Sequence, residues 1–363
     1  MTSERSGVAA YTAAVSDVSD ICVIGGGIIG MSVARDLALT GRSVTLLERD
    51  VPGRQASWAG AGMLPPAAPF RDAAFSDLIA RSHALWPDLS AALHEETGLD
   101  NGFRRCGGLE RAASESQRSE HAAAWQRAGA RVRLVDGGEL AAEHPAVDPA
   151  GCWYYLPDHW QVRNPRHLKA LEIACRTAGV DIRSGQTAHA IHEKPRSAIV
   201  RTLADRFESG HVVVAAGAWS QPLLAGLEPS SDRGVYPVRG QMLLLRTDVR
   251  LRAIIQDGPR YLVPRFDGRL LVGATVEDVG FTTQTTASGL ADLLGHAVRL
   301  CPALESAEVL SHWAGLRPQC DAGPRLGPVS ERVVAACGHF RDGLCLSPVT
   351  AAIVRDTVET SRS

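Results

Sequence analysis

The sequence has no marked excess of charge of either sign. Its 363 residues include 38 Lys and Arg and 40 Asp and Glu, which gives a formal net charge of -2. A surface that binds nucleic acid needs a concentrated basic face, with aromatic side chains among the basic ones. The tryptophans here are scattered and do not interleave with Lys and Arg clusters. We therefore expect no nucleic-acid partner.

Long apolar runs and metal-binding cysteine pairs are also missing. No run of about 18 apolar residues is present, so no membrane span is expected. The eight cysteines form no C-x-x-C pair, which argues against a zinc site, and we expect no metal. Cysteines used as small buried hydrophobic residues suit a reducing compartment, so we expect a cytoplasmic protein. Residues 1–17, weakly apolar and with only Arg5 as a basic residue, are interpreted as a flexible extension and not as a signal peptide.

The most informative segment that is present is DICVIGGGIIGMSVARDLALTGRSVTLLERD, Asp20–Asp50. It predicts a strand, a glycine turn, a helix to about Leu39 and a second strand. Gly25, Gly27 and Gly30 form G-x-G-x-x-G, which permits a tight turn, close approach of a pyrophosphate and close packing of helix on strand. Glu48, at the end of the second strand, can accept a hydrogen bond from a ribose hydroxyl. The segment predicts a dinucleotide site without a 2′-phosphate and leaves NAD and FAD open.

The next segment favours a large flat ligand. RQASWAGAGMLPP, residues 54–66, is rich in Ser, Ala and Gly, so its backbone could run close to such a ligand. An ordinary flexible loop is the alternative interpretation.

Later segments suggest two kinds of architecture. Residues 75–150 look helical, with residues 76–98 as the clearest amphipathic helix, and residues 211–220 look like a buried parallel strand. From about 235 to 312 the pattern is that of an antiparallel sheet, in which Asp267-Gly268 is expected as a hairpin pair with positive φ. Ser347 and Pro348 are expected to start the last helix as its N-cap and first residue.

These patterns predict an α/β fold with two domains. A discontinuous Rossmann-like dinucleotide-binding domain is assigned to residues 18–90, 150–230 and 312–363. A second, mainly antiparallel β-sheet domain that binds the substrate is assigned to residues 91–149 and 231–311. The ligand is expected in the cleft between them.

Eight separate motifs, in order, give the chain a family resemblance from about Ile21 to Val358. They are IGGGIIG, ASWAGAGML, QVRNPRHLKAL, VVVAAGAWS, VYPVRGQML, RYLVPRFDGRLLVGATVEDVGF, HWAGLRP and GHFRDGLCLSP. The chain resembles the flavin-dependent glycine oxidases of thiamine biosynthesis, within the D-amino-acid oxidase family. The resemblance implies FAD as the cofactor, in the first domain, and a small amino acid as the substrate.

The resemblance also assigns residues to the FAD site and the substrate site. With the glycines of the turn, the expected FAD positions are Gly25, Gly27, Ile28, Ile29, Gly30, Glu48, Arg49, Ala56, Ser57, Ala61, Gly62, Met63, Ala188, His339, Phe340, Arg341, Asp342, Gly343, Leu344 and Cys345. The expected catalytic and substrate-binding residues are Tyr261, Arg317 and Arg341, with Met63 beside the substrate.

Some positions depart from the family pattern. Pro259 stands where a histidine is found, and Val276 stands where a methionine is found. Related sarcosine oxidases attach the flavin to a cysteine, but that position aligns with Ala314 and not with Cys320, so non-covalent FAD is implied. The departures concern substrate preference and leave the chemistry intact.

The implied reaction is oxidative deamination of glycine, and of small amines such as sarcosine, by hydride transfer to the flavin. Its products are an imine or glyoxylate, ammonia and hydrogen peroxide with oxygen as acceptor, and the imine could pass to thiazole synthesis. Arg317 would bind the substrate carboxylate through a two-pronged contact, and pairing with an internal Asp or Glu is the alternative. Alternative functions are a D-amino-acid, sarcosine or imino-acid oxidase or dehydrogenase, an NAD-dependent dehydrogenase, and a non-catalytic flavoprotein. A homo-oligomer is expected.

Overall fold

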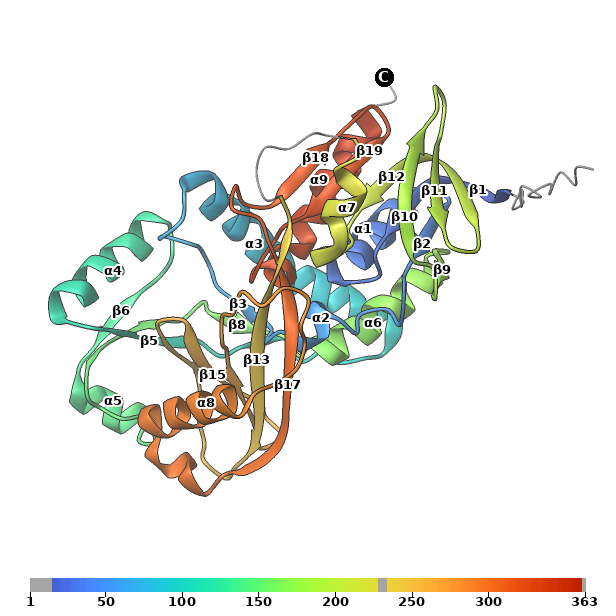
Figure 1. The fold of residues 1–363 in the computed structure, drawn as a ribbon. Coiled ribbons are helices and arrows are strands. Elements are labelled where there is room, and N and C mark those ends of the chain that lie inside the picture. Colours follow the sequence, from blue (N-terminus) through green and yellow to red (C-terminus); the bar gives the residue numbers. More distant parts are fainter. Residues whose placement is uncertain (1–14, 228–233, 361–363) are drawn as a thin grey trace, which may run out of the picture.

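The computed structural model describes residues 15–227 and 234–360. Within these ranges the strands form two eight-stranded sheets and one three-stranded sheet (Figure 1). Of the expected extension 1–17, residues 1–14 lie outside the described residues, and residues 15–17 begin strand β1.

The first sheet is built on parallel strands that carry the glycine motif. Its order is β10-β11-β12-β1-β2-β9, with β19 beside β12 and β18 beside β19. β1 pairs in parallel with β2 and β12, and β12 pairs in parallel with β19. The bounds are β1 Val15–Ile24, β2 Val44–Leu47, β9 Asp181–Arg183, β10 Ala188–Glu193, β11 Ala198–Thr202, β12 Arg206–Val214, β18 Arg325–Pro328 and β19 Val333–Cys337.

Both faces of this sheet are covered, which explains why its strands are apolar without alternation. Ile21 and Val23 of β1 pack with four helices, whereas Cys22 and Ile24 face a second core with α7 and β11. The helices are α1 Ile28–Leu39, α3 Ala73–Thr97, α6 Asn164–Thr177, α9 Gly343–Thr360 and α7 Ser220–Leu224. The predicted helix ending near Leu39 is therefore confirmed, and α3 confirms the amphipathic helix expected at 76–98.

The second sheet has the order β17-β13-β16-β15-β14-β5-β7-β6 and is antiparallel except between β14 and β5. Its bounds are β5 Gly108–Ala112, β6 Arg133–Val135, β7 Cys152–Leu156, β13 Tyr236–Arg246, β14 Ile254–Asp257, β15 Arg260–Pro264, β16 Arg269–Gly273 and β17 Glu308–Gln319. The helical expectation for residues 75–150 was wrong at β5 and β6, because these short strands are defined by pairing with distant β14 and β7. β17 runs through residue 312, so Arg317 is carried by this sheet.

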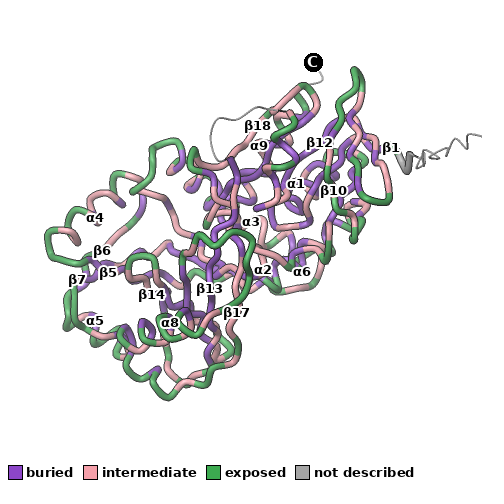
Figure 2. The backbone as a smooth tube through the Cα atoms, viewed as in Figure 1, coloured by how far each residue is buried: buried purple, intermediate pink, exposed green. Residues whose placement is uncertain are grey.

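One face of the second sheet is covered by α8, Ala287–Leu300, and the other carries a separate, smaller core. On that other face Met242 and Tyr261 form a core with Ala61. Figure 2 shows buried residues along β13 and around α1, whereas α4 is coloured exposed and intermediate and α5 is mostly exposed. The remaining bounds are α2 Ala56–Ala59, α4 Glu115–Arg127, α5 Gly137–Glu143, β3 Met63–Leu64, β4 Arg104–Arg105, β8 Trp160–Gln161, η1 Gly217–Trp219 and η2 Pro302–Ser306. Among the described helices, none combines the length and apolarity that a membrane crossing requires.

The turn between β15 and β16 differs from the expected one. Gly268 has a φ of 77°, but among the described residues Phe340 is the only non-glycine with positive φ, so Asp267 does not share the left-handed region. The Arg265 amide donates to the Arg269 carbonyl at 2.8 Å, which closes a three-residue loop. Such loops place one glycine in the left-handed region, not two residues.

Candidate active site

The glycine turn after β1 forms a cradle that larger residues would fill. Gly25 has a φ of 109°, and a Cβ there would lie 2.4 Å from the Ala215 carbonyl oxygen. A Cβ on Gly30 would lie 1.8 Å from the Gly25 oxygen, so α1 packs directly against the turn. Gly27 is the N-cap of α1 and contributes no side-chain cap. The glycine turn therefore leaves the N-terminus of α1, the positive end of the helix dipole, open to a phosphate group.

Glu48 follows β2 and lies beside this turn. Its Oε2 accepts a hydrogen bond from the Gly26 amide at 2.7 Å, and its Oε1 accepts one from the Asp50 amide at 2.9 Å. The side chain is buried, yet it lines the same cavity as the turn. Each carboxylate oxygen has a second lone pair for a ribose hydroxyl. Glu48 thus fixes the shape of the turn, a role that the sequence did not reveal.

We expect Glu48→Ala to weaken FAD binding by on the order of 1–3 kcal/mol, the usual size for a charge-assisted hydrogen bond. The measurement is a titration of the apoprotein with FAD. Asp50→Ala is the matched control, because Asp50 is exposed and supplies only its backbone amide to Glu48. An unchanged dissociation constant in Glu48→Ala would contradict the assignment.

One cavity of about 610 Å³ joins the turn to the second sheet. Most of the residues expected at the FAD and substrate sites line it: Gly25, Gly27, Ile28, Ile29, Glu48, Arg49, Ala56, Ser57, Ala61, Gly62, Met63, Ala188, Tyr261, Arg317, His339, Phe340, Arg341, Asp342, Gly343 and Leu344. Gly30 and Cys345 are not among its lining residues, and neither is the half-exposed Val276. The structure therefore brings most predicted positions to one cavity, while their roles stay predictions.

The last helix begins earlier than expected. α9 starts at Gly343, and Pro348 lies inside it, so the prediction that Ser347 and Pro348 start the helix was wrong. A proline removes the amide that would bond the Leu344 carbonyl. The Ser347 hydroxyl donates to that carbonyl instead, at 2.9 Å. Gly343 and Leu344, at the start of α9, line the cavity, whereas Pro348 does not.

Arg317 reaches the cavity from β17 across the neighbouring strand β13. A Cβ on Gly240 would lie 2.2–2.3 Å from three atoms of the Arg317 guanidinium, so this glycine makes room for it. Nη1 donates to the Thr275 carbonyl at 3.0 Å and to the Arg239 carbonyl at 3.4 Å. In the described part of the chain Arg317 forms no ion pair with a carboxylate, so the alternative of an internal acid partner is not observed. Burial lowers the pKa of Arg317, which means that its charge is poorly solvated.

Tyr261 lies on the same face of the sheet. Its ring covers Gly273, where a Cβ would lie 2.4 Å from the ring, and its hydroxyl donates to the Met242 sulfur at 3.3 Å. Burial raises the pKa of Tyr261, while the charges of Arg317 and Arg341 act in the opposite direction. The phenol therefore stays protonated at neutral pH and can donate to a carboxylate.

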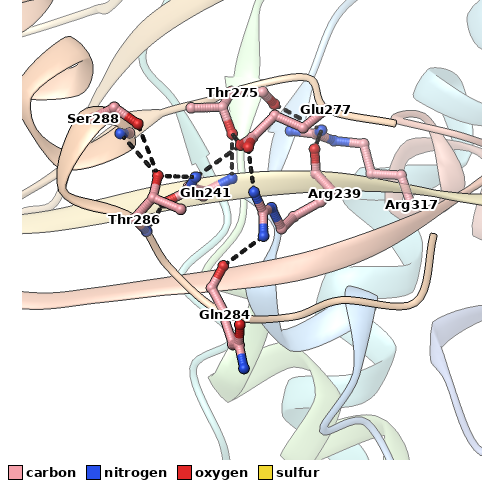
Figure 3. A network of polar contacts seen from close by, with 9 residues as sticks. Arg239, Gln241, Thr275, Glu277, Gln284, Thr286, Ser288 and Arg317 are labelled. Atoms are coloured by element: carbon pink, nitrogen blue, oxygen red, sulfur yellow. Dashed lines mark hydrogen bonds and ion pairs between the residues drawn. The ribbon is translucent and has the colours of Figure 1, made fainter. Parts of the chain in front are cut away.

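The carbonyls that hold Arg317 are themselves fixed by a network of polar side chains (Figure 3). Glu277 forms an ion pair with Arg239 and accepts hydrogen bonds from the Thr275 hydroxyl and, at 2.8 Å, from the Gln241 amide. Burial would raise the pKa of Glu277, but the hydrogen bonds from Arg239, Thr275 and Gln241 lower it to about 2. The carboxylate is therefore charged at neutral pH and holds both carbonyl-bearing segments together.

The segment before α9 contributes a strained residue and an acid. Phe340 has a φ of 51°, and its amide donates to the Pro318 carbonyl at 2.8 Å. Such strain persists where the surrounding structure imposes it, often at functional sites. Burial raises the pKa of Asp342 to about 6, against the charges of Arg71 and Arg341. Arg341 itself is exposed at the cavity wall, so its part in substrate binding stays a prediction.

Several residues of the cavity were not predicted from the sequence. They are Glu110, Trp125, His159, Trp219 and Gln256, all of which line the cavity. The guanidinium of Arg49 stacks 3.4 Å from the ring centroid of Trp219. Only the alternation of residues along β5 and β14 could have pointed to Glu110 and Gln256, and both strands are short.

The cavity fits FAD. The cradle that a Cβ would fill, the open start of α1 and the carboxylate of Glu48 suit the diphosphate and ribose of a dinucleotide. The same cavity continues to a half-buried, poorly solvated arginine and a buried tyrosine that suit a small carboxylate. The fold and the site together define a dinucleotide-dependent oxidoreductase with separate cofactor and substrate sheets.

The comparisons assign this chain to a family within that class. It belongs to DAO, the FAD dependent oxidoreductase family, which matches residues 20–357. FAD is therefore the cofactor, and the NAD alternative is set aside.

The chain spans nearly all of some named relatives and about half of others. A glycine oxidase of Geobacillus kaustophilus is 33% identical over 94% of this chain and 93% of the relative. A bifunctional protein ThiO/ThiG of Trichormus variabilis is 34% identical over 95% of this chain, which spans about half of that relative, 53%. The crystal structure of the Geobacillus glycine oxidase superposes with a TM-score of 0.90, at 33% identity, and covers 95% of each chain.

We expect the FAD to be bound without a covalent bond. Ala314 stands on β17, and Cys320 does not line the cavity. Of the eight cysteines, all within the described residues, Cys337 is the one that lines it. Acid or heat should release all the flavin into the supernatant, as measured by absorbance. Fluorescent flavin that stays on the denatured chain would contradict this, and Cys337→Ala would then show whether this thiol is the attachment point.

Proposed function

We propose that this protein is an FAD-dependent glycine oxidase, which converts glycine to an imine or glyoxylate, ammonia and hydrogen peroxide with oxygen as acceptor. Small N-alkyl glycines would give the same products, with an alkylamine in place of ammonia. The observation that carries the proposal is Arg317, a half-buried and poorly solvated guanidinium on the FAD cavity, whose donors meet neutral groups and no acid among the described residues. Desolvating such a charge is costly unless an anion binds it. The glycine oxidases among the relatives support the identity of that anion.

The residues of this chain would act mainly by binding and orientation. Arg317 would hold both carboxylate oxygens of glycine, and the Tyr261 hydroxyl would donate to one of them. When bound, FAD supplies the acceptor for the hydride that leaves the substrate carbon. Binding at the carboxylate would orient the substrate carbon. No side-chain base need remove a proton from this carbon, because the amine enters neutral and its lone pair forms the imine. The N-terminus of α9 at Gly343, the positive end of its helix dipole, would stabilise negative charge on a group bound next to it.

Anaerobic mixing with glycine tests the proposal. The FAD-loaded protein should lose its flavin absorbance near about 450 nm, a general flavin property, within the turnover time. Admitting oxygen should restore the colour and yield peroxide, ammonia and glyoxylate in equal amounts. A protein that holds FAD but is not bleached by glycine, sarcosine or small D-amino acids would instead be the non-catalytic flavoprotein.

The substrate range gives a separate prediction. We expect glycine and sarcosine to give a higher kcat/KM than D-phenylalanine, on the basis of the relatives. Of the two positions that depart from the family pattern, Pro259 lines the cavity and Val276 does not, so we expect preference to depend on Pro259 and Met63. The measurement is peroxide formation over a panel of amino acids. A higher kcat/KM for D-phenylalanine would favour the D-amino-acid oxidase alternative.

The setting of the reaction is part of the same proposal. The ThiO/ThiG relatives suggest that the imine passes to thiazole assembly in thiamine biosynthesis. We also propose a cytoplasmic, homo-oligomeric enzyme. The eight cysteines form no disulfide, which supports a reducing compartment.

A further inference from the structure

A row of polar side chains crosses the second sheet from the substrate site to the far end of the cavity. Tyr154, Glu110, Gln256 and Tyr261 are successive cross-strand partners on β7, β5, β14 and β15. Their neighbours Leu109, Ile255 and Leu262 form the core on the opposite face. Partners in register lie on the same face of a sheet. Glu110 and Gln256 therefore share the face of Tyr261.

Glu110 is a buried acid without a cation. The residue is 7% exposed and lines the cavity. Its Oε2 accepts a hydrogen bond from the Tyr154 hydroxyl at 2.5 Å, and it forms no ion pair within the described residues. Burial raises the pKa of Glu110 to about 7, against the effect of the Tyr154 hydrogen bond. An unpaired buried carboxylate is costly, so a cation that binds beside Glu110 would favour its ionised form.

Two more side chains at this end have unused hydrogen-bonding capacity. His159 is 2% exposed and lines the cavity, and neither of its ring nitrogens has a partner in the structure. Gly108 makes room for it, because a Cβ there would lie 2.6 Å from Nδ1. Burial lowers the pKa of His159 to about 3, so the neutral ring offers one donor and one acceptor. The amide of Gln256 lies between Glu110 and Tyr261 in the row.

Aromatic side chains complete this end of the cavity. Trp125 and Phe70 both line it, with ring centroids 6.3 Å apart in an edge-to-face arrangement. Aromatic faces beside a carboxylate favour an organic cation. Arg71 and Arg341 also line the cavity, and their charges act on Asp342, but neither forms an ion pair with Glu110 among the described residues.

We propose that Glu110, with His159 and Gln256, forms a distal subsite that binds the ammonium group of a ligand whose carboxylate is held by Arg317. Glu110 lies two strand intervals from Tyr261 and four from Gly240 of β13, over which the Arg317 guanidinium lies, which is about 19 Å between the β13 and β5 backbones at the usual strand spacing. The matching ligands are therefore long-chain ω-amino acids. The subsite relies on the proposed function only for the carboxylate anchor.

Ligands without an α-amine test the subsite without turnover. The FAD-loaded protein is titrated calorimetrically with 4-aminobutyrate, 6-aminohexanoate and 8-aminooctanoate, and with the fatty acids in which a methyl group replaces the ammonium. At about pH 8.5, where Glu110 is ionised, we expect one of the three to bind at least about tenfold tighter than its methyl counterpart, as for a hydrogen bond between charged groups. In Glu110→Gln, which can keep the Tyr154 hydrogen bond, this advantage should fall to less than about threefold.

Asp257→Asn is the matched control. Asp257 follows Gln256 on β14, does not line the cavity and lies 3.7 Å from Arg111, so its loss removes a nearby charge of the same sign. The preference should persist in this variant. A wild-type protein that prefers no ω-amino acid, or a preference that survives in Glu110→Gln, overturns the subsite.

The glycine assay separates this inference from the proposed function. Glycine oxidation without any ammonium preference would remove the subsite and leave the glycine oxidase. An ammonium preference that depends on Glu110 in a protein that does not oxidise glycine would keep the subsite and assign another substrate to the site.

Discussion

Replacing Arg317 with alanine should lower kcat/KM for glycine by roughly 3–5 kcal/mol of transition-state free energy, or about two to three and a half orders of magnitude. The side chain is a half-buried, poorly solvated cation on the cavity, and its partners among the described residues are carbonyl groups and the neutral Tyr261 hydroxyl. Its loss would leave the substrate carboxylate desolvated without a partner. Steady-state peroxide formation measures the effect.

Arg317→Lys should fall between the wild type and alanine, because it keeps the charge and loses the planar two-pronged contact. The FAD content of both variants should stay near normal, since Glu48 and the glycine turn lie at the other end of the cavity. Arg246→Ala is the control, because this arginine is exposed on β13 in the same sheet.

A simple amine without a carboxylate distinguishes anchoring from damage to the fold. Its oxidation should fall much less than that of glycine in Arg317→Ala, because it makes no use of the guanidinium. Equal losses for the two substrates, or a variant that no longer holds FAD, would assign Arg317 a structural role.

The local parts of this fold could be read from the sequence. The turn at Gly25, the end of α1 near Leu39 and the position of Glu48 after β2 depend on residues within about one supersecondary unit. Glycine is required where a Cβ would strike the Ala215 carbonyl, and the spacing of the motif encodes that contact. The family resemblance extended this information to positions that spacing alone could not assign.

Contacts between distant segments could not be read in the same way. Arg317 meets the Thr275 and Arg239 carbonyls, 42 and 78 residues away in the chain. Glu110 stands in the pattern GLERA, which has no strong strand signal, and it becomes buried only through the parallel pairing of β5 with β14. No short-range pattern could predict an unpaired acid in this cavity.

Pro348 shows how tertiary contacts override a local signal. Its sequence context is typical of a helix start, yet α9 begins five residues earlier, at Gly343. The Cys345 carbonyl within this first turn accepts hydrogen bonds from the Ser82 hydroxyl at 2.6 Å and the Trp86 indole at 3.0 Å. These two contacts from α3 hold the first turn of α9 in place before the proline. They favour a helix start at Gly343, which the sequence alone disfavours.

The second large effect is expected at Glu277, which lies away from the reacting atoms. Glu277→Ala should lower the free energy of unfolding by roughly 2–4 kcal/mol, because Arg239, with a side chain only 6% exposed, would lose its acid partner. Glu277 itself is 26% exposed, so water screens part of its charge and weakens the pair. Glu308→Ala is the matched control, since its pair with Arg246 is 57–58% exposed and should be worth at most about 1 kcal/mol. Denaturant unfolding of the FAD-loaded proteins measures both.

Glu277 should also act as a positioning residue for Arg317. Without it the segments that bear the Thr275 and Arg239 carbonyls lose their common partner, so KM for glycine should rise more than kcat falls. Glu277→Gln should recover part of the loss, because an amide can still bond Thr275 and Gln241. A variant that loses stability but keeps the wild-type KM would show that the network supports the sheet and not the substrate site.

The pH dependence separates charge from packing. Because the pKa of Glu277 is about 2 in the folded protein, against 4.5 for an ordinary glutamate, its ionised form stabilises the fold above about pH 4.5. That contribution is lost as the pH falls toward 2. The difference in unfolding free energy between the wild type and Glu277→Gln should therefore shrink steadily from about pH 5 to about pH 3. A difference that stays constant over this range would assign the effect to lost packing, and the charge of Glu277 would then have no part in holding Arg317.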